Sequence, residues 1–332
     1  MTLADHLRPP GTADPTAAAY KDWLHLNLFD HGTGRTGLIN LSLHGAPTAA
    51  SSLAVGAALV EDPDTGWVGN VIVRSRADSA VRETSIALDD AALALEPTSG
   101  RLLASVRRAV DGLVVTAAAR PTAQPFAAEL PHPFGSGWIG WRVVPRLEVS
   151  GTAGVLGTAV DLAGWVAYHD HNWGRWHWGD DIGWEWGAFA AADGTTFVLA
   201  CTTNRAHTRS GPPLLVADVA GTRRNFSGPR LRLQWSGPCQ SPRRRLPGAL
   251  AALHTDRMAA RVPQRLVIEA DDGVDRIELH FTARSTAQLI LTDPSRPGVS
   301  FLHELAGTFT ADCHVRRTHT EVDGLAMVER LE

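Results

Sequence analysis

The 332-residue chain is too long for one ordinary domain and suits two, and its 44% hydrophobic and 20% charged content excludes a disordered chain. A net charge of −4, with no basic run longer than Arg243–Arg245, offers no surface for nucleic acid, so no such partner is expected. Three cysteines without a Cys-x-x-Cys pair argue against a disulfide framework and a structural zinc site.

No apolar signal core and no apolar run of about 18 residues is present. We therefore expect a cytoplasmic protein without a transmembrane segment. Transient contact with a membrane surface stays open, and the oligomeric state is not predicted.

Residues 1–19 are rich in Pro, Gly, Ala and Thr and predict a loose lead-in. Residues 20–133 then contain short apolar or alternating segments bounded by Gly, Pro, Asp or Ser, which is typical of strands in a sandwich or barrel. The predicted strands are Trp23–Phe29, Gly37–His44, Ala54–Val60, Trp67–Arg74, Thr84–Leu88, Arg101–Val106 and Leu113–Ala119.

Turn residues concentrate in Arg120–Pro125 and Pro131–Gly137, which predicts a domain boundary between residues 133 and 134. Residues 134–332 form the second predicted domain and again read as strands. Helices are expected to be few and short, with Leu246–Met258 a helix or a loop and Ser300–Gly307 a helical turn. The predicted strands are Gly140–Ser150, Val160–Tyr168, Gly183–Ala191, Thr196–Thr203, Leu214–Val219, Arg230–Trp235, Arg265–Ala270, Asp275–Ala283, Gln288–Thr292, Gly307–Val315 and Ala326–Leu331.

The segment Tyr168–Trp186 stands out because tryptophans crowd in and beside it, among histidines and acids. Six of the eleven tryptophans lie between residues 165 and 186. Indole rings at this density build either a thick core or the wall of an apolar cavity. The six are Trp165, Trp173, Trp176, Trp178, Trp184 and Trp186.

Two acids in this segment have open readings. Asp170 either takes part in chemistry or accepts backbone hydrogen bonds that order the turn expected to follow Tyr168. Glu185 alternates with Trp184 and Trp186 along a predicted strand, so it points either into a barrel, where burial would raise its pKa, or outward to solvent.

The stretch Tyr168-His-Asp-His-Asn-Trp-Gly resembles the Asp-His-x-Trp-Gly signature of the lipocalin-like proteins related to bacterial carotenoid 1,2-hydratase, to the AttH-type proteins and, distantly, to tocopherol cyclase. Gly183-Trp-Glu-Trp and Asp193-Gly resemble the next motif of that family. Weaker similarity extends to Trp23–Asp30, Pro145–Gly151 and Glu304–Thr310. The resemblance implies an all-β chain with two tandem lipocalin-like antiparallel β-barrel domains.

The resemblance also implies an apolar isoprenoid or polyene substrate that is hydrated or cyclised without a cofactor. Such a reaction needs an acid that protonates an alkene and aromatic faces that stabilise the resulting carbocation. We expect Asp170 to be the proton donor, His171 and Asn172 to orient it or a water molecule, and Glu185 to be the alternative acid. The expected substrate-binding residues are Tyr168, Trp173, Trp176, Trp178, Trp184, Trp186 and His25.

Two other functions stay open. Lipocalin-type barrels often only carry an apolar ligand, although a carrier gains nothing from burying acids. A metal-dependent site could use His169 and His171, which share a strand face, together with His177. Because the segment Arg175–Asp181 and the N-terminal region depart from the family, the identity of the substrate is not carried over.

Overall fold

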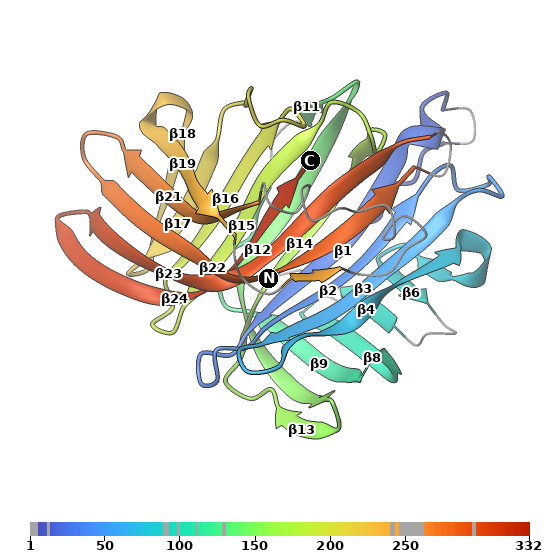
Figure 1. Ribbon diagram of the computed structural model, residues 1–332, viewed down its shortest axis with the longest axis horizontal. Helices are drawn as coiled ribbons and strands as arrows, with labels where there is room; N and C mark the ends of the chain where they lie inside the picture. The colour runs from blue at the N-terminus through green and yellow to red at the C-terminus, as the bar shows by residue number, and fades with distance from the viewer. Residues whose placement is uncertain are drawn as a thin grey trace. The chain divides into compact units, whose positions relative to one another are not determined.

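The computed structural model describes residues 6–11, 14–88, 93–97, 100–110, 112–127, 131–239, 243–245, 262–293 and 297–332. The chain forms two compact units, each built on one curled β-sheet (Figure 1), and this confirms the expected all-β class. Within the described residues the helices are three short 3₁₀ turns, and none is long and apolar enough to cross a membrane. These turns are η1 (Ala17–Ala19), η2 (Arg76–Asp78) and η3 (Gly228–Arg230).

The first unit consists of Met1–Asp30, Gly37–Asp180 and Leu291–Ser300. Its sheet contains 14 described strands in the order β4-β3-β2-β1-β14-β12-β9-β8-β7-β6-β5, with β10, β11 and β13 paired to β12. The strands are β1 (Tyr20–Phe29), β2 (Thr36–His44), β3 (Leu53–Asp62), β4 (Gly66–Ser75), β5 (Ala80–Arg82), β6 (Ser85–Leu88), β7 (Leu93–Pro97), β8 (Leu102–Val110), β9 (Leu113–Pro121), β10 (Phe126–Ala127), β11 (His132–Phe134), β12 (Gly137–Val155), β13 (Thr158–Asp161) and β14 (Val166–Arg175).

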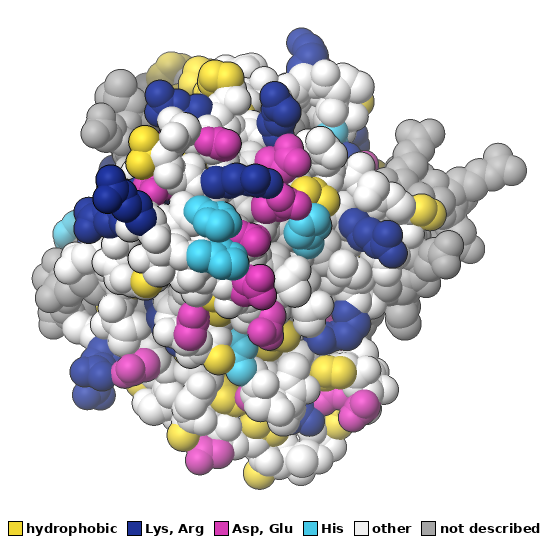
Figure 2. Space-filling model, turned by 90° about the vertical axis from the view of Figure 1, so that its left-hand side faces the viewer, with side chains coloured by type: hydrophobic (Ala, Val, Ile, Leu, Met, Phe, Trp, Pro, Cys, Tyr) yellow, Lys and Arg dark blue, Asp and Glu magenta, His cyan; other side chains and the backbone are white. Residues whose placement is uncertain are grey.

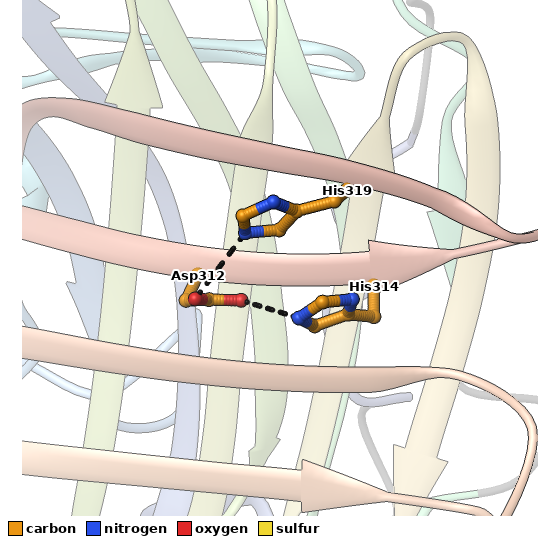
Figure 3. Close-up of side chains that lie close together, drawn as sticks. All are labelled: Asp312, His314 and His319. Atoms are coloured by element: carbon orange, nitrogen blue, oxygen red, sulfur yellow. Dashed lines mark hydrogen bonds and ion pairs between the residues drawn. The ribbon is translucent and has the colours of Figure 1, made fainter.

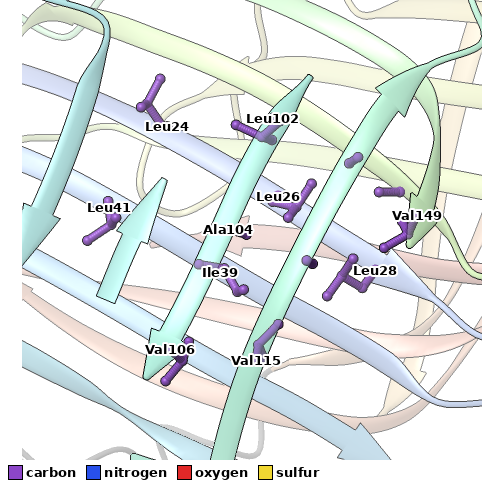
Figure 4. Packing of buried hydrophobic residues seen from close by; sticks show 14 of the residues in the cluster. Leu24, Leu26, Leu28, Ile39, Leu41, Leu102, Ala104, Val106, Val115 and Val149 are labelled. Atoms are coloured by element: carbon purple, nitrogen blue, oxygen red, sulfur yellow. The ribbon is translucent and has the colours of Figure 1, made fainter. Parts of the chain in front are cut away.

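Alternating burial explains why these segments form strands around one core. In β9 the side chains of Leu113, Val115, Ala117 and Ala119 are buried, whereas those between them are more exposed. The inward-facing aliphatic side chains of β1, β2, β8, β9 and β12 pack together (Figure 4). Each fully buried aliphatic side chain contributes about 1.5–3 kcal/mol, so this cluster holds the curled sheet together.

The second unit consists of His31–Thr36, Asp181–Ile290 and Phe301–Glu332. Its sheet contains 10 described strands in the order β18-β17-β16-β15-β24-β23-β22-β21-β19, and the short β20 runs parallel to β22. The strands are β15 (Gly183–Ala191), β16 (Thr196–Thr203), β17 (Leu214–Val219), β18 (Thr222–Ser227), β19 (Leu231–Pro238), β20 (Arg243–Arg245), β21 (Pro263–Asp271), β22 (Arg276–Thr292), β23 (Val299–Val315) and β24 (Thr318–Leu331).

Aromatic rings fill the core of the second unit. Phe309 packs edge-on against Phe189 at 5.6 Å and against Phe197 at 5.8 Å between ring centroids. Phe281 packs in the same way against Phe189 at 6.1 Å. These edge-to-face contacts place the positive edge of one ring against the negative face of another, which is the favourable arrangement.

The chain passes from the first sheet to the second after Asp180, whereas the sequence placed the boundary between residues 133 and 134. The turn-rich stretch at that place lies within the first sheet, because β10 and β11 pair with β12 there. Turn residues mark the short connections between these strands as strongly as they would mark a linker. The Trp-rich segment is consequently divided, with Tyr168–Asp180 in the first unit and residues 181–186 in the second.

Not every predicted element matches the structure. The expected strand Val160–Tyr168 is interrupted after Asp161, and a new strand begins at Val166 and runs to Arg175. Tyr168–Arg175 is therefore a strand rather than a strand end and turn. Ser300–Gly307 lies in β23 instead of a helical turn, because its pairing with β24 overrides local preference. Leu246–Met258 lies outside the described residues.

Candidate active site

Strand β14 presents two chemically different faces. All ten of its residues are buried. Because side chains alternate along a strand, Tyr168, Asp170 and Asn172 lie on one face, which we call the Asp170 face, and the residues at 169, 171 and 173 point the other way. Strands β1 and β12 flank β14 on its two edges, so their side chains extend both faces.

Asp170 is a buried acid held by its two neighbours on this face. Its side chain is 3% exposed. The Tyr168 hydroxyl donates to Oδ2 at 2.6 Å, and Nδ2 of Asn172 donates to Oδ1. Burial raises the pKa of Asp170 to about 7, and this outweighs the lowering effects of Tyr168, His171 and Asn172. A proton is therefore available on this carboxyl group near neutral pH.

His25 lies directly opposite Asp170 on β1 and is uncharged. Its Nδ1 accepts a 3.2 Å hydrogen bond from the amide of Asn40, which leaves the ring proton on Nε2. Burial lowers the pKa of His25 to about 4. Because the neutral ring brings no positive charge, it does not favour the ionised form of Asp170 as an imidazolium would.

Aromatic side chains extend the Asp170 face on both sides. Asn172 lies opposite Trp23 on β1 and opposite Trp141 on β12. Trp176, which follows the end of β14, packs edge-on against Trp23 with ring centroids 5.4 Å apart. The acid thus shares its face with indole rings, whose π faces attract a developing positive charge.

His171 points to the other face and pairs with a different acid. Its Nε2 lies 2.8 Å from Oδ1 of Asp22, a fully buried residue of β1. The Tyr20 hydroxyl donates to Oδ2 of Asp22 at 2.8 Å, and the backbone N–H of Arg8 donates to the same oxygen at 2.7 Å. His171 is therefore held by Asp22 and does not orient the carboxyl group of Asp170 by hydrogen bonding.

The tryptophans expected to line one site lie in different environments. Trp173 lies on the His171 face, where the guanidinium group of Arg8 stacks over its ring at 3.7 Å. Trp176 is fully buried and packs edge-on against Trp178 at 5.7 Å. The indole N–H of Trp178 donates to Nδ1 of His44 at 3.2 Å. Trp176 also contacts Trp23 beside the Asp170 face.

The histidines of the alternative metal site have separate partners. His169 donates from Nδ1 to the backbone oxygen of His25 at 2.7 Å. His177 pairs through Nδ1 with Asp293 at 2.9 Å, and the buried Lys21 ammonium group lies 3.4 Å from the same carboxylate. In the part of the chain that the structure describes, no group of ligand atoms unites residues 169, 171 and 177.

Glu185 belongs to the second unit and faces its interior, on the same side of β15 as Phe189. Burial acts to raise the pKa of Glu185, but the hydrogen bond from Nδ1 of His207 at 3.0 Å and the nearby Arg330 outweigh it and hold the pKa below its usual range. The expected raised pKa is therefore wrong. Glu185 is a carboxylate near neutral pH and keeps no proton in reserve.

Trp184 and Trp186 alternate with Glu185 and point to the opposite face of β15. The indole N–H of Trp184 donates to Oε2 of Glu329 at 3.0 Å, and Trp186 is half-buried. Both residues belong to the second unit, whereas Asp170 belongs to the first.

The structure adds residues that the sequence did not single out. Trp23 and Trp141 flank Asn172, and Asp22 pairs with His171. Asp22 breaks the alternation of polar and apolar residues in Tyr20–Phe29, which is a weak signal for it. Nothing local indicates Trp141, because its place depends on the pairing of β12 with β14.

The fold is the two-domain lipocalin-like fold. Solved structures that share it include an AttH-type protein from Nitrosomonas europaea, with 16% sequence identity and a TM-score of 0.65 over 97% of each chain. Kievitone hydratase from Nectria haematococca shares 14% identity with a TM-score of 0.63, over 99% of this chain and 97% of that one.

CghA, in a structure with Sch210972, shares 11% identity with a TM-score of 0.55, over 100% of this chain and 96% of that one. No family model and no curated protein sequence matches the chain. At these identities the likeness shows the fold alone.

Proposed function

We propose that the protein is an enzyme that hydrates or cyclises an apolar isoprenoid or polyene substrate, with Asp170 as the proton donor. The observation that carries the proposal is the buried Asp170 carboxyl group, whose pKa is raised to about 7 on a face that it shares with indole rings. A buried, protonated carboxylic acid is the group that alkene protonation requires.

The first step transfers the Asp170 proton to one carbon of a C=C bond. The π electron pair forms the new C–H bond, and the neighbouring carbon becomes a carbocation while Asp170 becomes a carboxylate. In hydration a water molecule adds to the cation and returns a proton to Asp170. In cyclisation a second C=C bond attacks the cation, and loss of a proton from carbon restores the acid. Both routes are redox-neutral, so neither calls for a redox cofactor.

Tyr168 and Asn172 fix the orientation of the acid. Each donates to a different carboxyl oxygen, so the acidic proton occupies a remaining lone-pair direction and points away from both donors. The same two hydrogen bonds stabilise the carboxylate that forms as the proton leaves. They therefore stabilise the carboxylate present after proton transfer more than the protonated acid present before it.

Trp23 and Trp141 are the rings best placed to stabilise the cation. They lie on the two strands that neighbour β14, each directly opposite Asn172, which is the residue next to Asp170 on this face. A well-placed aromatic face contributes about 0.5–2 kcal/mol to the stability of a cation. These residues take the place of Trp173, which lies on the other face of β14.

The fold neighbours support this class of reaction. One of them is named as a hydratase, and its likeness extends along the whole chain. The three cysteines are free and buried, which agrees with the cytoplasmic location that we propose.

The test is to incubate the purified protein with a panel of isoprenoids and polyenes and to analyse the recovered ligands by mass spectrometry and chromatography. A gain of one water identifies a hydratase, and an unchanged mass with altered retention identifies a cyclase. Loss of both products in Asp170→Asn, with binding retained in a tryptophan-fluorescence titration, assigns the proton to Asp170. A bound ligand that is always recovered unchanged would make the protein a carrier.

A further inference from the structure

A second cluster of chemically active side chains lies on the hairpin formed by β23 and β24 in the second unit. Asp312 and His314 come from β23, and His319 comes from β24 (Figure 3). Figure 2, which views the side of the molecule where this hairpin lies, shows histidine side chains beside acidic ones on the surface. The cluster is separate from the residues of the Asp170 face and does not depend on the function proposed for them.

The hairpin turn brings the two histidines together. Val315 pairs with Thr318, so Arg316 and Arg317 form a two-residue turn with φ of 49° and 66°, the left-handed conformation that such tight hairpins require. His314 therefore lies directly opposite His319. Their rings are nearly parallel, with an interplanar angle of 9° and centroids 4.4 Å apart.

The carboxylate of Asp312 bridges the Nε2 atoms of the two rings. Its Oδ1 is 3.1 Å from Nε2 of His314, and its Oδ2 is 3.4 Å from Nε2 of His319. One ligand atom from each residue lies within 4.8 Å of the others. Oε1 of Glu321, which pairs with Asp312 across the strands, is 4.0 Å from Nε2 of His319. Two imidazoles and a carboxylate thus converge on one small volume.

We propose that Asp312, His314 and His319 bind a divalent transition-metal ion, with Zn²⁺ as the cation best suited to the site. Two imidazole nitrogens and one carboxylate are a recurring donor set for zinc, and water completes the coordination. Mg²⁺ and Ca²⁺ prefer oxygen ligands, so they fit this set poorly. The metal replaces the contacts that the imidazoles make with Asp312.

The exposure of the three side chains makes this binding accessible. Each is about half exposed, at 50–55% of its surface, so small rotations can bring the donor atoms to metal-ligand distances of about 2.0–2.2 Å. The bound ion joins β23 to β24 near the turn. It therefore cross-links the two strands at the end of the hairpin.

His280 provides a matched control on the same sheet. It is an exposed histidine of β22, and its Nε2 lies 3.0 Å from Oε1 of Glu278. It lacks the second imidazole that the hairpin cluster has, because within the described residues only Asp312, His314 and His319 form a group of three ligands. Replacing His280 removes one surface histidine and leaves the proposed site intact.

Equilibrium dialysis against Zn²⁺, on protein freed of any affinity tag, tests the proposal. The protein and His280→Ala should bind Zn²⁺ with equal affinity at this site, and His314→Ala and His319→Ala should each weaken it by about tenfold or more. Asp312→Asn should weaken it as well. Equal binding by all variants, or an equal loss in His280→Ala, would overturn the proposal. Thermal melts without metal should coincide for all variants, since the changes lie on the surface.

Electron paramagnetic resonance with one equivalent of Cu²⁺ identifies the donor atoms directly. Copper accepts the same nitrogen and oxygen ligands and binds more strongly than zinc. The native protein should show superhyperfine splitting from two nitrogens, and His319→Ala should show splitting from one. A native spectrum without two nitrogen donors, or one that His319→Ala leaves unchanged, would refute the site.

Discussion

The hydroxyl of Tyr168 donates a 2.6 Å hydrogen bond to Oδ2 of Asp170, two residues further along the same strand. This bond stabilises the carboxylate and lowers the pKa of Asp170 against the effect of burial. In Tyr168→Phe we therefore expect the pKa of Asp170 to rise by about one unit or more. The high-pH limb of the activity profile should move to higher pH by the same amount.

Tyr20→Phe is the control for this change. The Tyr20 hydroxyl makes a 2.8 Å bond of the same kind, but to Asp22 on the opposite face of the sheet. Its removal should leave the pH profile in place. A profile that moves in Tyr20→Phe and not in Tyr168→Phe would show that Asp22, rather than Asp170, supplies the proton.

The rate of product formation should fall as the pH rises through about 7, the pKa of Asp170. The proposed reaction uses the protonated acid, and its population declines above this pH. The measurement is kcat/KM for product formation across neutral pH. A rate that increases through this range would show that the group acts as a base.

The raised pKa of Asp170 also predicts how stability depends on pH. The folded-state pKa of about 7 lies above the usual value of 3.8, so the folded protein binds the extra proton between these values. The stability from this group is full below about pH 4 and declines as the pH rises to about 7, by about 4 kcal/mol in total. The amide introduced by Asp170→Asn stays neutral at every pH. In urea unfolding, the free energy of unfolding of the variant should therefore increase relative to that of the native protein as the pH rises. A constant difference would contradict the raised pKa.

Breaking the buried pair of Asp22 and His171 should destabilise the protein strongly. Both side chains are almost fully buried, so removing one partner leaves the other without its counterpart. We expect Asp22→Asn and His171→Gln each to lower the free energy of unfolding by about 3–5 kcal/mol, measured by chemical denaturation.

Arg120→Ala serves as the comparison for this pair. Arg120 and Glu148 are 2.7 Å apart but largely exposed, so the loss should stay below about 1 kcal/mol. Similar losses in all three variants would mean that burial does not decide the strength of these pairs.

Gly174 lies where the neighbouring strand and an indole ring leave no space for a side chain. A methyl group at this position would overlap the backbone oxygen of Trp138 and lie 2.7 Å from Cζ3 of Trp176. Gly174→Ala should therefore destabilise the first unit by about 1–3 kcal/mol. In Gly154→Ala, on the neighbouring strand β12, the methyl group meets only Val114 at 3.9 Å, so thermal unfolding should change little.

Local patterns were sufficient to predict most strands and to single out Asp170 as a candidate site residue. Alternating burial in segments such as Leu113–Ala119 follows from the sequence, because one face of each strand must be apolar. The crowding of tryptophans around Asp170 is likewise evident from the sequence. These features depend on neighbours in the sequence.

The remaining features depend on pairing between distant strands. His25 meets Asp170, and Trp141 meets Asn172, only because β1 and β12 flank β14. The ionisation of Glu185 depends on His207, from a loop 22 residues later. No local pattern encodes these partners, so both the composition of the Asp170 face and the charge of Glu185 required the structure.

The pairing of β1 with β14 has a consequence for biosynthesis. Strand β1 has no partner at this edge until residues 166–175 have been synthesised. Asp293, which pairs with Lys21 of the same unit, is synthesised later still. The first unit therefore cannot finish folding until the ribosome has made residues 181–290 of the second, and such long-range closure is slow. A polypeptide stopped at residue 133 would lack β12 and β14 and present unpaired strand edges, which are prone to aggregate.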